Sequence, residues 1–200
     1  MTKLTLFHTA HVHADTFNTL APNAELDHTV REDWLARAQD GIDEFLATEI
    51  ASAIQAADGP VLCSCTTIGE VAEQAGATRI DWPMMQEAAQ IGGPVLMAYC
   101  LDSTAAPSEA LLRRAFGEDD PQLTCLKLAQ HWPLFEAGEI DDFANALAAD
   151  IKATLEQNQF SCVVLAQASM AGAAKVLRAI TDVLVLASPE IAVRYLLTEG

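Results

Sequence analysis

Short apolar runs alternate with helical patterns along the whole chain, and this alternation limits the possible fold more than any other feature. Six runs are the length of single strands and end abruptly in small or polar residues: Leu4 to Phe7, Val61 to Cys65, Val95 to Leu101, Leu123 to Leu128, Cys162 to Leu165 and Val183 to Leu186. Because these runs lack strict polar and apolar alternation, we expect strands that are covered on both faces. Parallel strands need crossovers, which helices supply, so the sequence predicts an α/β fold with mainly parallel sheets flanked by helices.

Three segments between these runs have the spacing of amphipathic helices. The longest extends from Glu32 to about Ala57, where Asp58, Gly59 and Pro60 stop it. A second pattern covers residues 108–116, with Ser108 as its cap after Pro107. A third covers residues 141–155.

The size and charge of the chain exclude several classes of protein. Its 200 residues fit one domain or two small ones, and 51% of them are hydrophobic, which excludes a disordered chain. It has 11 Lys and Arg residues against 28 Asp and Glu, a formal charge of −17, which repels phosphate backbones and anionic lipid. We therefore expect neither a nucleic-acid nor a membrane partner. Homo-oligomer formation remains open.

The N-terminal segment and the cysteines both indicate a cytoplasmic protein. His8 and Asp15 come too early for the apolar core of a secretory signal. The cysteines number five, an odd count, and most lie in strand-like apolar runs. Because cytosolic thiols stay reduced, we expect no disulfide framework.

The two halves of the sequence resemble each other. Residues 61–69 align with residues 163–171, each a buried strand, a small or polar tip and an alanine-rich helix. A weaker match relates residues 94–98 to residues 182–186. These matches predict one compact unit, residues 1–200, of two similar α/β lobes around a common cleft. The approximate boundaries are residues 1–93 with the C-terminal segment, and residues 94–182.

Cys65 is the candidate reactive residue of this cleft. Ligands of parallel α/β sheets bind at the carboxyl ends of the strands, where helix N-termini present free N–H groups. Cys65 lies at such an end, beside Thr66 and Thr67 and before a helix start, an environment that can lower a thiol pKa. Cys63 lies within the strand and is expected to be structural. The remaining cysteines, Cys100, Cys125 and Cys162, are expected in the core.

Val61 to Gly69, followed by Ala72 and Glu73, resembles the first cysteine motif of the aspartate/glutamate racemase superfamily, which includes hydantoin racemases, maleate isomerases and arylmalonate decarboxylases. Further segments resemble other motifs of the family in order: Leu4 to Thr9, Ile80 to Ala88, Leu101 to Pro107, Cys162 to Ala174 and Ala187 to Glu190. The resemblance implies two pseudo-symmetric lobes with the active site between them and no cofactor.

One position departs from the two-cysteine pattern of that family. Gln167 stands where the second thiol is expected, so Cys65 alone remains of the pair. Racemisation by the family's route needs a second thiol on the opposite face, which an amide does not supply. Single-cysteine decarboxylases keep the second thiol of the pair, whereas this chain keeps the first.

Polar residues at the other expected strand ends suit a carboxylate-binding cleft. Hydroxyl groups and adjoining backbone N–H groups can bind an oxyanion there. The candidate substrate-binding residues are His8, Thr9, Thr66, Thr67, Ser103, Thr104, Ser169 and Ser188. Helix capping is the alternative role of each hydroxyl. Asp81 and Asp102 either orient loops, contact substrate or lie on the solvated surface, and His28 either joins the cleft or lies in a surface turn.

A rival interpretation uses the early histidines as metal ligands. His8, His11, His13 and Asp15 follow the first strand, as in amidohydrolase-like barrels. Such a barrel takes about 250 residues, more than this chain has. We therefore expect no metal.

The sequence as a whole predicts a cofactor-independent racemase or isomerase that acts on a small carboxylate-bearing substrate, with Cys65 and Gln167 in the catalytic site. The alternatives are a single-cysteine decarboxylase-like lyase, a non-enzymatic binding protein of small carboxylates, and a metal-dependent hydrolase. The sequence does not identify the substrate.

Overall fold

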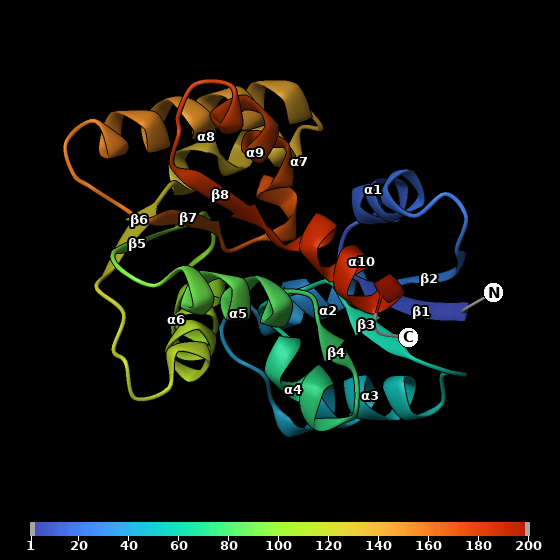
Figure 1. The fold of residues 1–200 in the computed structure, drawn as a ribbon. Coiled ribbons are helices and arrows are strands. Elements are labelled where there is room, and N and C mark those ends of the chain that lie inside the picture. Colours follow the sequence, from blue (N-terminus) through green and yellow to red (C-terminus); the bar gives the residue numbers. More distant parts are fainter. Residues whose placement is uncertain (1–2, 199–200) are drawn as a thin grey trace.

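Two separate four-stranded sheets form the framework of the protein. The computed structural model describes residues 3–198, and every strand pairing in it is parallel. The first sheet has the order β2-β1-β3-β4 and contains β1 (Lys3–His8), β2 (Glu25–Val30), β3 (Val61–Cys63) and β4 (Thr78–Arg79). The second has the order β6-β5-β7-β8 and contains β5 (Val95–Tyr99), β6 (Leu123–Lys127), β7 (Cys162–Leu165) and β8 (Leu184–Ala187) (Figure 1). The predicted α/β fold with two parallel-sheet lobes is confirmed.

Helices cover both faces of the first sheet, as the apolar runs of β1 and β3 predict. Leu62 faces α1 (Val12–Leu20) and α10 (Ser188–Thr198), which contribute Phe17 and Ala192 to its cluster. The neighbouring Cys63 faces the opposite cluster. That cluster contains residues of α2 (Glu32–Ala38), α3 (Glu44–Gln55) and α4 (Gly69–Gln74). Successive strand residues therefore face different helix layers. We call this sheet with α1 to α4 and α10 the first lobe.

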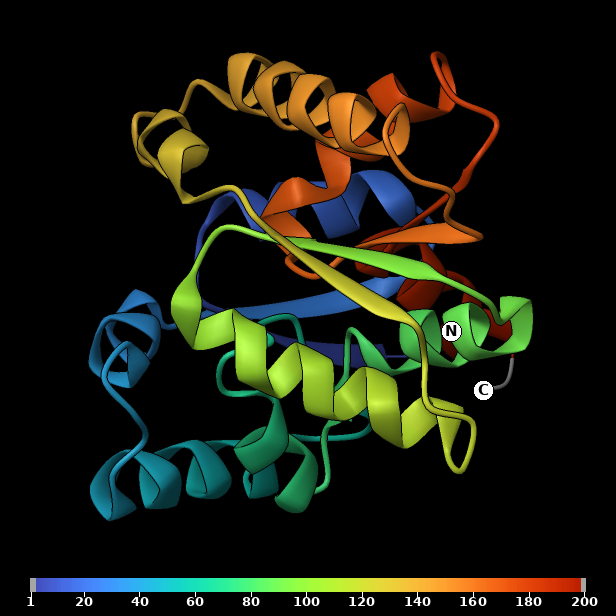
Figure 2. The ribbon, with the colours of Figure 1, turned by 90° about the vertical axis from the view of Figure 1, so that its left-hand side faces the viewer.

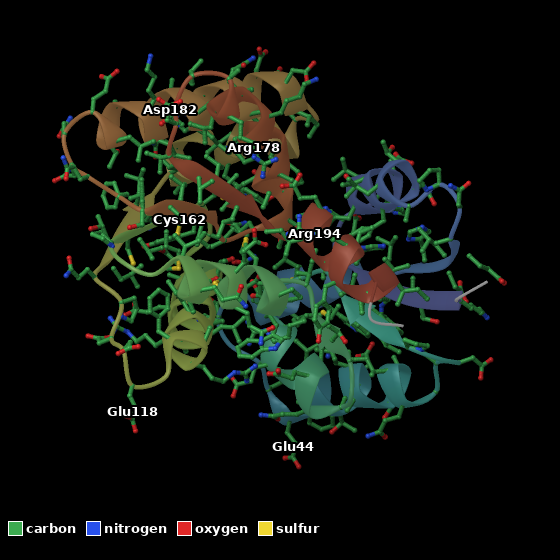
Figure 3. The ribbon with its side chains drawn as sticks, viewed as in Figure 1. Glu44, Glu118, Cys162, Arg178, Asp182 and Arg194 are labelled. Atoms are coloured by element: carbon green, nitrogen blue, oxygen red, sulfur yellow. The ribbon has the colours of Figure 1, made fainter. Side chains whose placement is uncertain are left out.

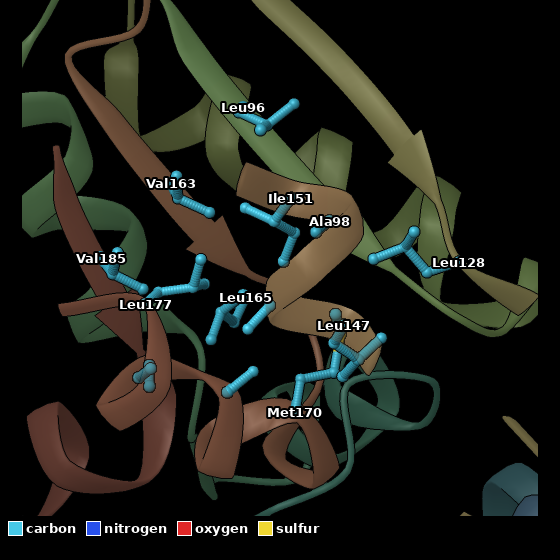
Figure 4. Close-up of a cluster of buried hydrophobic side chains, with 14 of the residues drawn as sticks. Leu96, Ala98, Leu128, Leu147, Ile151, Val163, Leu165, Met170, Leu177 and Val185 are labelled. Atoms are coloured by element: carbon cyan, nitrogen blue, oxygen red, sulfur yellow. The ribbon is translucent and has the colours of Figure 1, made fainter. Parts of the chain in front are cut away.

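The second sheet is enclosed in the same way. Leu96, Val163 and Val185 pack against Ile151 and Leu177, which belong to α8 (Ile140–Leu155) and α9 (Ala171–Arg178) (Figure 4). The other face packs on α5 (Trp82–Ile91) and α6 (Asp102–Phe116). Figure 2 shows α8 and α6 on opposite sides of the strands. This sheet with α5 to α9, including the short α7 (Trp132–Glu136), is the second lobe.

The chain returns to the first lobe at its C-terminal end. β8 is the edge strand of the second sheet, but the following α10 packs against α1 and α5 (Figure 1). One apolar cluster therefore contains Leu4, Ala168 and Ala192, from both lobes and both ends of the chain.

Two helix predictions are wrong in their extent. The expected helix from Glu32 to Ala57 is two helices, separated around Gly41, whose φ of 118° lies in the left-handed region that glycine tolerates. The expected helix from Ser108 begins at Asp102, and Pro107 lies within it. Ser108 is thus a buried helix residue whose hydroxyl has no hydrogen-bond partner, and it is not a cap. The helix predicted over residues 141–155 is confirmed as α8.

The surface carries the acidic excess of the composition. Glu44 and Glu118 project from the body of the protein into solvent (Figure 3). Cys125 is exposed because β6 is the edge strand of its sheet, so its predicted core position is wrong. Within residues 3–198, no helix has the length and apolar character needed to cross a membrane.

Candidate active site

A cavity of about 840 Å³ lies where the two lobes meet. The end of β3 and the end of β7 both open into it, as the similarity between the two half-sequences predicts. Cys65 and Gln167 line it from opposite lobes. Five of the predicted substrate-binding residues also line it: Thr9, Thr66, Thr67, Thr104 and Ser169.

Hydrogen-bond donors surround the Cys65 thiol at the floor of this cavity. These donors are the hydroxyls of Thr9 and Thr67 and the backbone N–H groups of Thr67 and Ile68, and they favour the thiolate. Burial acts in the other direction and is the larger effect, so the pKa of Cys65 is raised above its ordinary value. The lowered pKa of Cys65 expected from the sequence is therefore wrong, because the thiol at this strand end is deeply buried.

The amide of Gln167 is fixed by the backbone of the second lobe. Its Oε1 accepts hydrogen bonds from the backbone N–H groups of Cys100, at 2.6 Å, and Leu101, at 3.0 Å. These N–H groups lie between the end of β5 and the start of α6. Since the carbonyl end is committed to them, the amide presents its NH₂ group as the remaining donor, and it has no acidic proton to transfer.

Hydroxyl groups also join the two lobes beside the cavity. Thr66 donates a hydrogen bond to the carbonyl oxygen of Ala166 at 3.2 Å. The hydroxyls of Thr67 and Ser103 are 3.2 Å apart, and Ser103 also hydrogen bonds Gln39 at 3.2 Å. These contacts fix the β3 tip against the second lobe and thereby set the width of the cavity floor.

Three predicted binding residues do not line the cavity. Ser103 lies just behind Thr67, and Ser188 is buried at the start of α10. His8 is 1% exposed, and its Nδ1 lies 2.7 Å from the hydroxyl oxygen of Ser64, which does line the cavity. His8 and Thr9 were both expected to line the cleft at the tip of the first strand, but successive side chains at the end of β1 point in opposite directions, so Thr9 lines the cavity and His8 does not.

A chain of hydrogen bonds leads from Ser64 through His8 toward the surface. His8 Nε2 lies 2.8 Å from Nδ1 of His28, whose Nε2 lies 3.1 Å from the side-chain oxygen of Asn18. Because the Asn18 oxygen only accepts, His28 carries its proton on Nε2, and each group in the chain donates toward Asn18. Burial lowers the pKa of His8 to about 3, so its imidazole is neutral, and its Nδ1 accepts a hydrogen bond from the Ser64 hydroxyl.

The other early histidines do not form a metal centre with His8. Among residues 3–198, no group of three or more His, Cys, Asp or Glu side chains is arranged to hold a metal ion. His13 lines the cavity, 6.5 Å from the ring of Phe135 between centroids, and burial lowers its pKa to about 4. His11 also lines the cavity but is exposed.

The two acidic residues that the sequence left open both fix loops. Asp81 is fully buried and forms a two-pronged ion pair with Arg79, at 3.0 and 2.9 Å. Asp102 pairs with Lys127 on the surface. Neither lines the cavity.

Sequence reasoning missed the upper part of the cavity. Trp132 and Phe135 of α7 form one wall, and Glu32 and Glu136 lie at the exposed rim. The available signal was the spacing of the two aromatic residues, three positions apart in a segment that begins Trp-Pro.

Comparisons with known proteins give structural matches only. The sequence matches no protein-family model and no curated protein. Among solved structures, a glutamate racemase from Francisella tularensis in complex with D-glutamate superposes with a TM-score of 0.70 at 11% identity, over 99% of this chain and 80% of that chain. This chain has the racemase fold.

Two allantoin racemases share the racemase fold as well. The enzyme from Klebsiella pneumoniae gives a TM-score of 0.69 at 14% identity, over 99% of this chain and 87% of its own. The enzyme from Pseudomonas fluorescens gives a TM-score of 0.65 at 12% identity, over 98% of this chain and 89% of that chain. The shared fold thus extends over both lobes of this chain.

Proposed function

We propose that the protein is a cofactor-independent enzyme of the racemase and isomerase type, which removes and returns a proton at a carbon next to a carboxylate. The observation that carries the proposal is the Cys65 thiol, which lies in the cavity between the lobes among hydroxyl and backbone N–H donors that favour its thiolate. The racemase fold of the chain supports the same conclusion.

In this mechanism the Cys65 thiolate takes the α-proton, which yields a thiol and an enediolate. N–H and hydroxyl donors at the cavity floor stabilise the developing negative charge. The thiol then returns a proton to the same carbon. Gln167 donates a hydrogen bond from the opposite lobe but supplies no proton, so both transfers take place on the face of Cys65.

Deuterium exchange tests this proposal. The protein is incubated in deuterium oxide with a panel of amino acids, hydantoins, maleate and substituted malonates, and α-hydrogen loss is followed by proton NMR. We expect stereospecific exchange of one substrate class, abolished by Cys65→Ser and retained by Cys63→Ala. Cys63 is the matched control because it lies two residues away but outside the cavity. Exchange that survives in Cys65→Ser would exclude the thiol as the base.

Gln167→Cys tests the one-sided mechanism. A thiol at this position faces Cys65 from the other lobe, so we expect the variant to racemise a substrate that the wild type only exchanges. Optical rotation follows the reaction. Efficient racemisation by the wild type would refute the assignment of Gln167.

The raised pKa of Cys65 favours a second candidate, in which the thiol stays protonated and the cavity only binds its ligand. In that case calorimetry detects binding of a small carboxylate, but no member of the panel exchanges its α-hydrogen at any pH at which the protein is folded.

A further inference from the structure

The chemical character of the cavity changes from its floor to its rim. The floor consists of buried, uncharged polar groups, among them Cys65, Thr67 and Gln167. The walls above them are apolar, with partly buried Trp132 and Phe135 from the second lobe and Leu35 and Ala36 from the first. The exposed Glu32 and Glu136 lie at the rim, one from each lobe.

The lining contains no cation to offset these two carboxylates. No Lys or Arg is among the cavity-lining residues within the described range 3–198. Arg31, next to Glu32 in sequence, forms ion pairs with Asp33 and Glu49 instead. A ligand carboxylate is therefore held by N–H and hydroxyl donors at the floor, and a second carboxylate nearer the rim meets Glu32 and Glu136 with no Lys or Arg in the described lining to offset them.

Trp132 and Phe135 form an aromatic wall of the cavity, and Phe135 also stacks with His13, at 6.5 Å between ring centroids. Trp132 and Phe135 stack with their ring centroids 4.8 Å apart. The ring centroid of Phe143 lies 6.2 Å from that of Trp132 and 5.5 Å from that of Phe135. Phe143 is buried and fixes the two rings in place, whereas Trp132 and Phe135 are partly exposed and line the cavity. Rigid aromatic rings of this kind favour an aromatic substituent over an aliphatic one of equal size.

We propose that the substrate is a carbon acid with a single carboxylate and an apolar, preferably aromatic, group on its α-carbon. The carboxylate lies at the floor beside Cys65, and the apolar group lies along Trp132 and Phe135. Dicarboxylates such as glutamate are excluded by the acidic rim. This assignment rests on the proposed proton-transfer function for its chemistry, but ligand binding tests it separately.

Two matched pairs of acids isolate the two parts of the proposal. Pentanoate and glutarate have the same chain length and differ by one carboxylate. Phenylacetate and cyclohexylacetate differ in the aromaticity of the ring. By titration calorimetry at low salt, we expect pentanoate to bind about tenfold more tightly than glutarate, and phenylacetate about fivefold more tightly than cyclohexylacetate.

Variants of the lining must change these ratios in a defined direction. Glu136→Gln should strengthen glutarate binding about threefold relative to pentanoate, and the matched control Glu139→Gln, outside the cavity, should not. Trp132→Ala should remove the preference for phenylacetate. Phe135→Leu, which keeps more of the packing against Phe143, tests the same wall if the alanine variant fails to fold.

The binding and exchange results separate the two proposals. Phenylacetate that binds with the expected preference but exchanges neither α-hydrogen in deuterium oxide supports this substrate class and contradicts the proposed function. Glutarate that binds as tightly as pentanoate, or exchanges faster than phenylacetate, overturns the substrate class and leaves proton transfer intact. Failure of all four acids to bind also overturns it.

Discussion

Replacing His13 with phenylalanine should make the folded protein less sensitive to mild acid. The His13 side chain is buried against Phe135, and burial lowers its pKa from 6.5 to about 4. Between these values the unfolded chain binds a proton that the folded protein does not bind. The free energy of unfolding therefore falls as the pH decreases from 6.5 toward 4, and the stabilisation is fully present only above 6.5.

The size of the effect follows from the same two values. Each pH unit in this range lowers the free energy of unfolding by about 1.36 kcal/mol, so acidification to about pH 5 lowers it by about 2 kcal/mol through His13. His8 adds a similar loss, because its pKa of about 3 is also depressed by burial. Phenylalanine keeps the ring contact with Phe135 but does not ionise.

Urea unfolding, followed by far-ultraviolet circular dichroism at about pH 7 and about pH 5, measures this difference. The loss of stability between the two conditions should be about 2 kcal/mol smaller in His13→Phe than in the wild type. His11→Gln is the matched control, since His11 is exposed two residues away, and its loss should equal that of the wild type. An unchanged loss in His13→Phe would refute the assignment of a buried neutral imidazole.

Three further substitutions probe the floor and its supports. Asp81→Asn leaves the buried Arg79 charge unpaired and should lower the free energy of unfolding by about 3 to 5 kcal/mol; a loss below about 1 kcal/mol would show that the pair is hydrated. Thr9→Val removes a donor to the Cys65 thiolate, so the pKa of Cys65, measured by ultraviolet absorbance of the thiolate, should rise; an unchanged pKa would contradict that contact. Thr66→Val removes a hydrogen bond between the lobes and should cost about 1 kcal/mol by urea unfolding, with no change expected if water replaces it.

Six of the eight strands described in residues 3–198 were predictable from sequence for a simple physical reason, whereas the polar β2 and the two-residue β4 were not among the predicted runs. A strand buried on both faces must be apolar at every position, so β7 is visible as residues 162–165 without reference to the rest of the chain. The polar tip follows because the sheet ends there. Cys65 and Gln167 could thus be assigned to one cleft from two short segments.

Features that depend on packing between distant segments were not predictable. The break in the first long helix was hidden because Ile42 keeps the helical spacing across Gly41, while Asp43 caps the next helix with a 2.7 Å bond from the N–H of Leu46. The thiol pKa depends on burial by residues from several elements. The aromatic wall belongs to α7, whose position over the cavity is set by packing on Phe143.

The shared apolar cluster of Leu4, Ala168 and Ala192 has a consequence for how the protein folds. The first lobe contains the earliest strand of the chain, yet one face of that strand is covered by the last helix. During synthesis only α1 is available to cover this face until α10 has also been made, whereas the second lobe can bury its strands from consecutive segments. The contacts that close the first lobe have the greatest sequence separation in the molecule, so their formation is expected to be a late and slow event in folding.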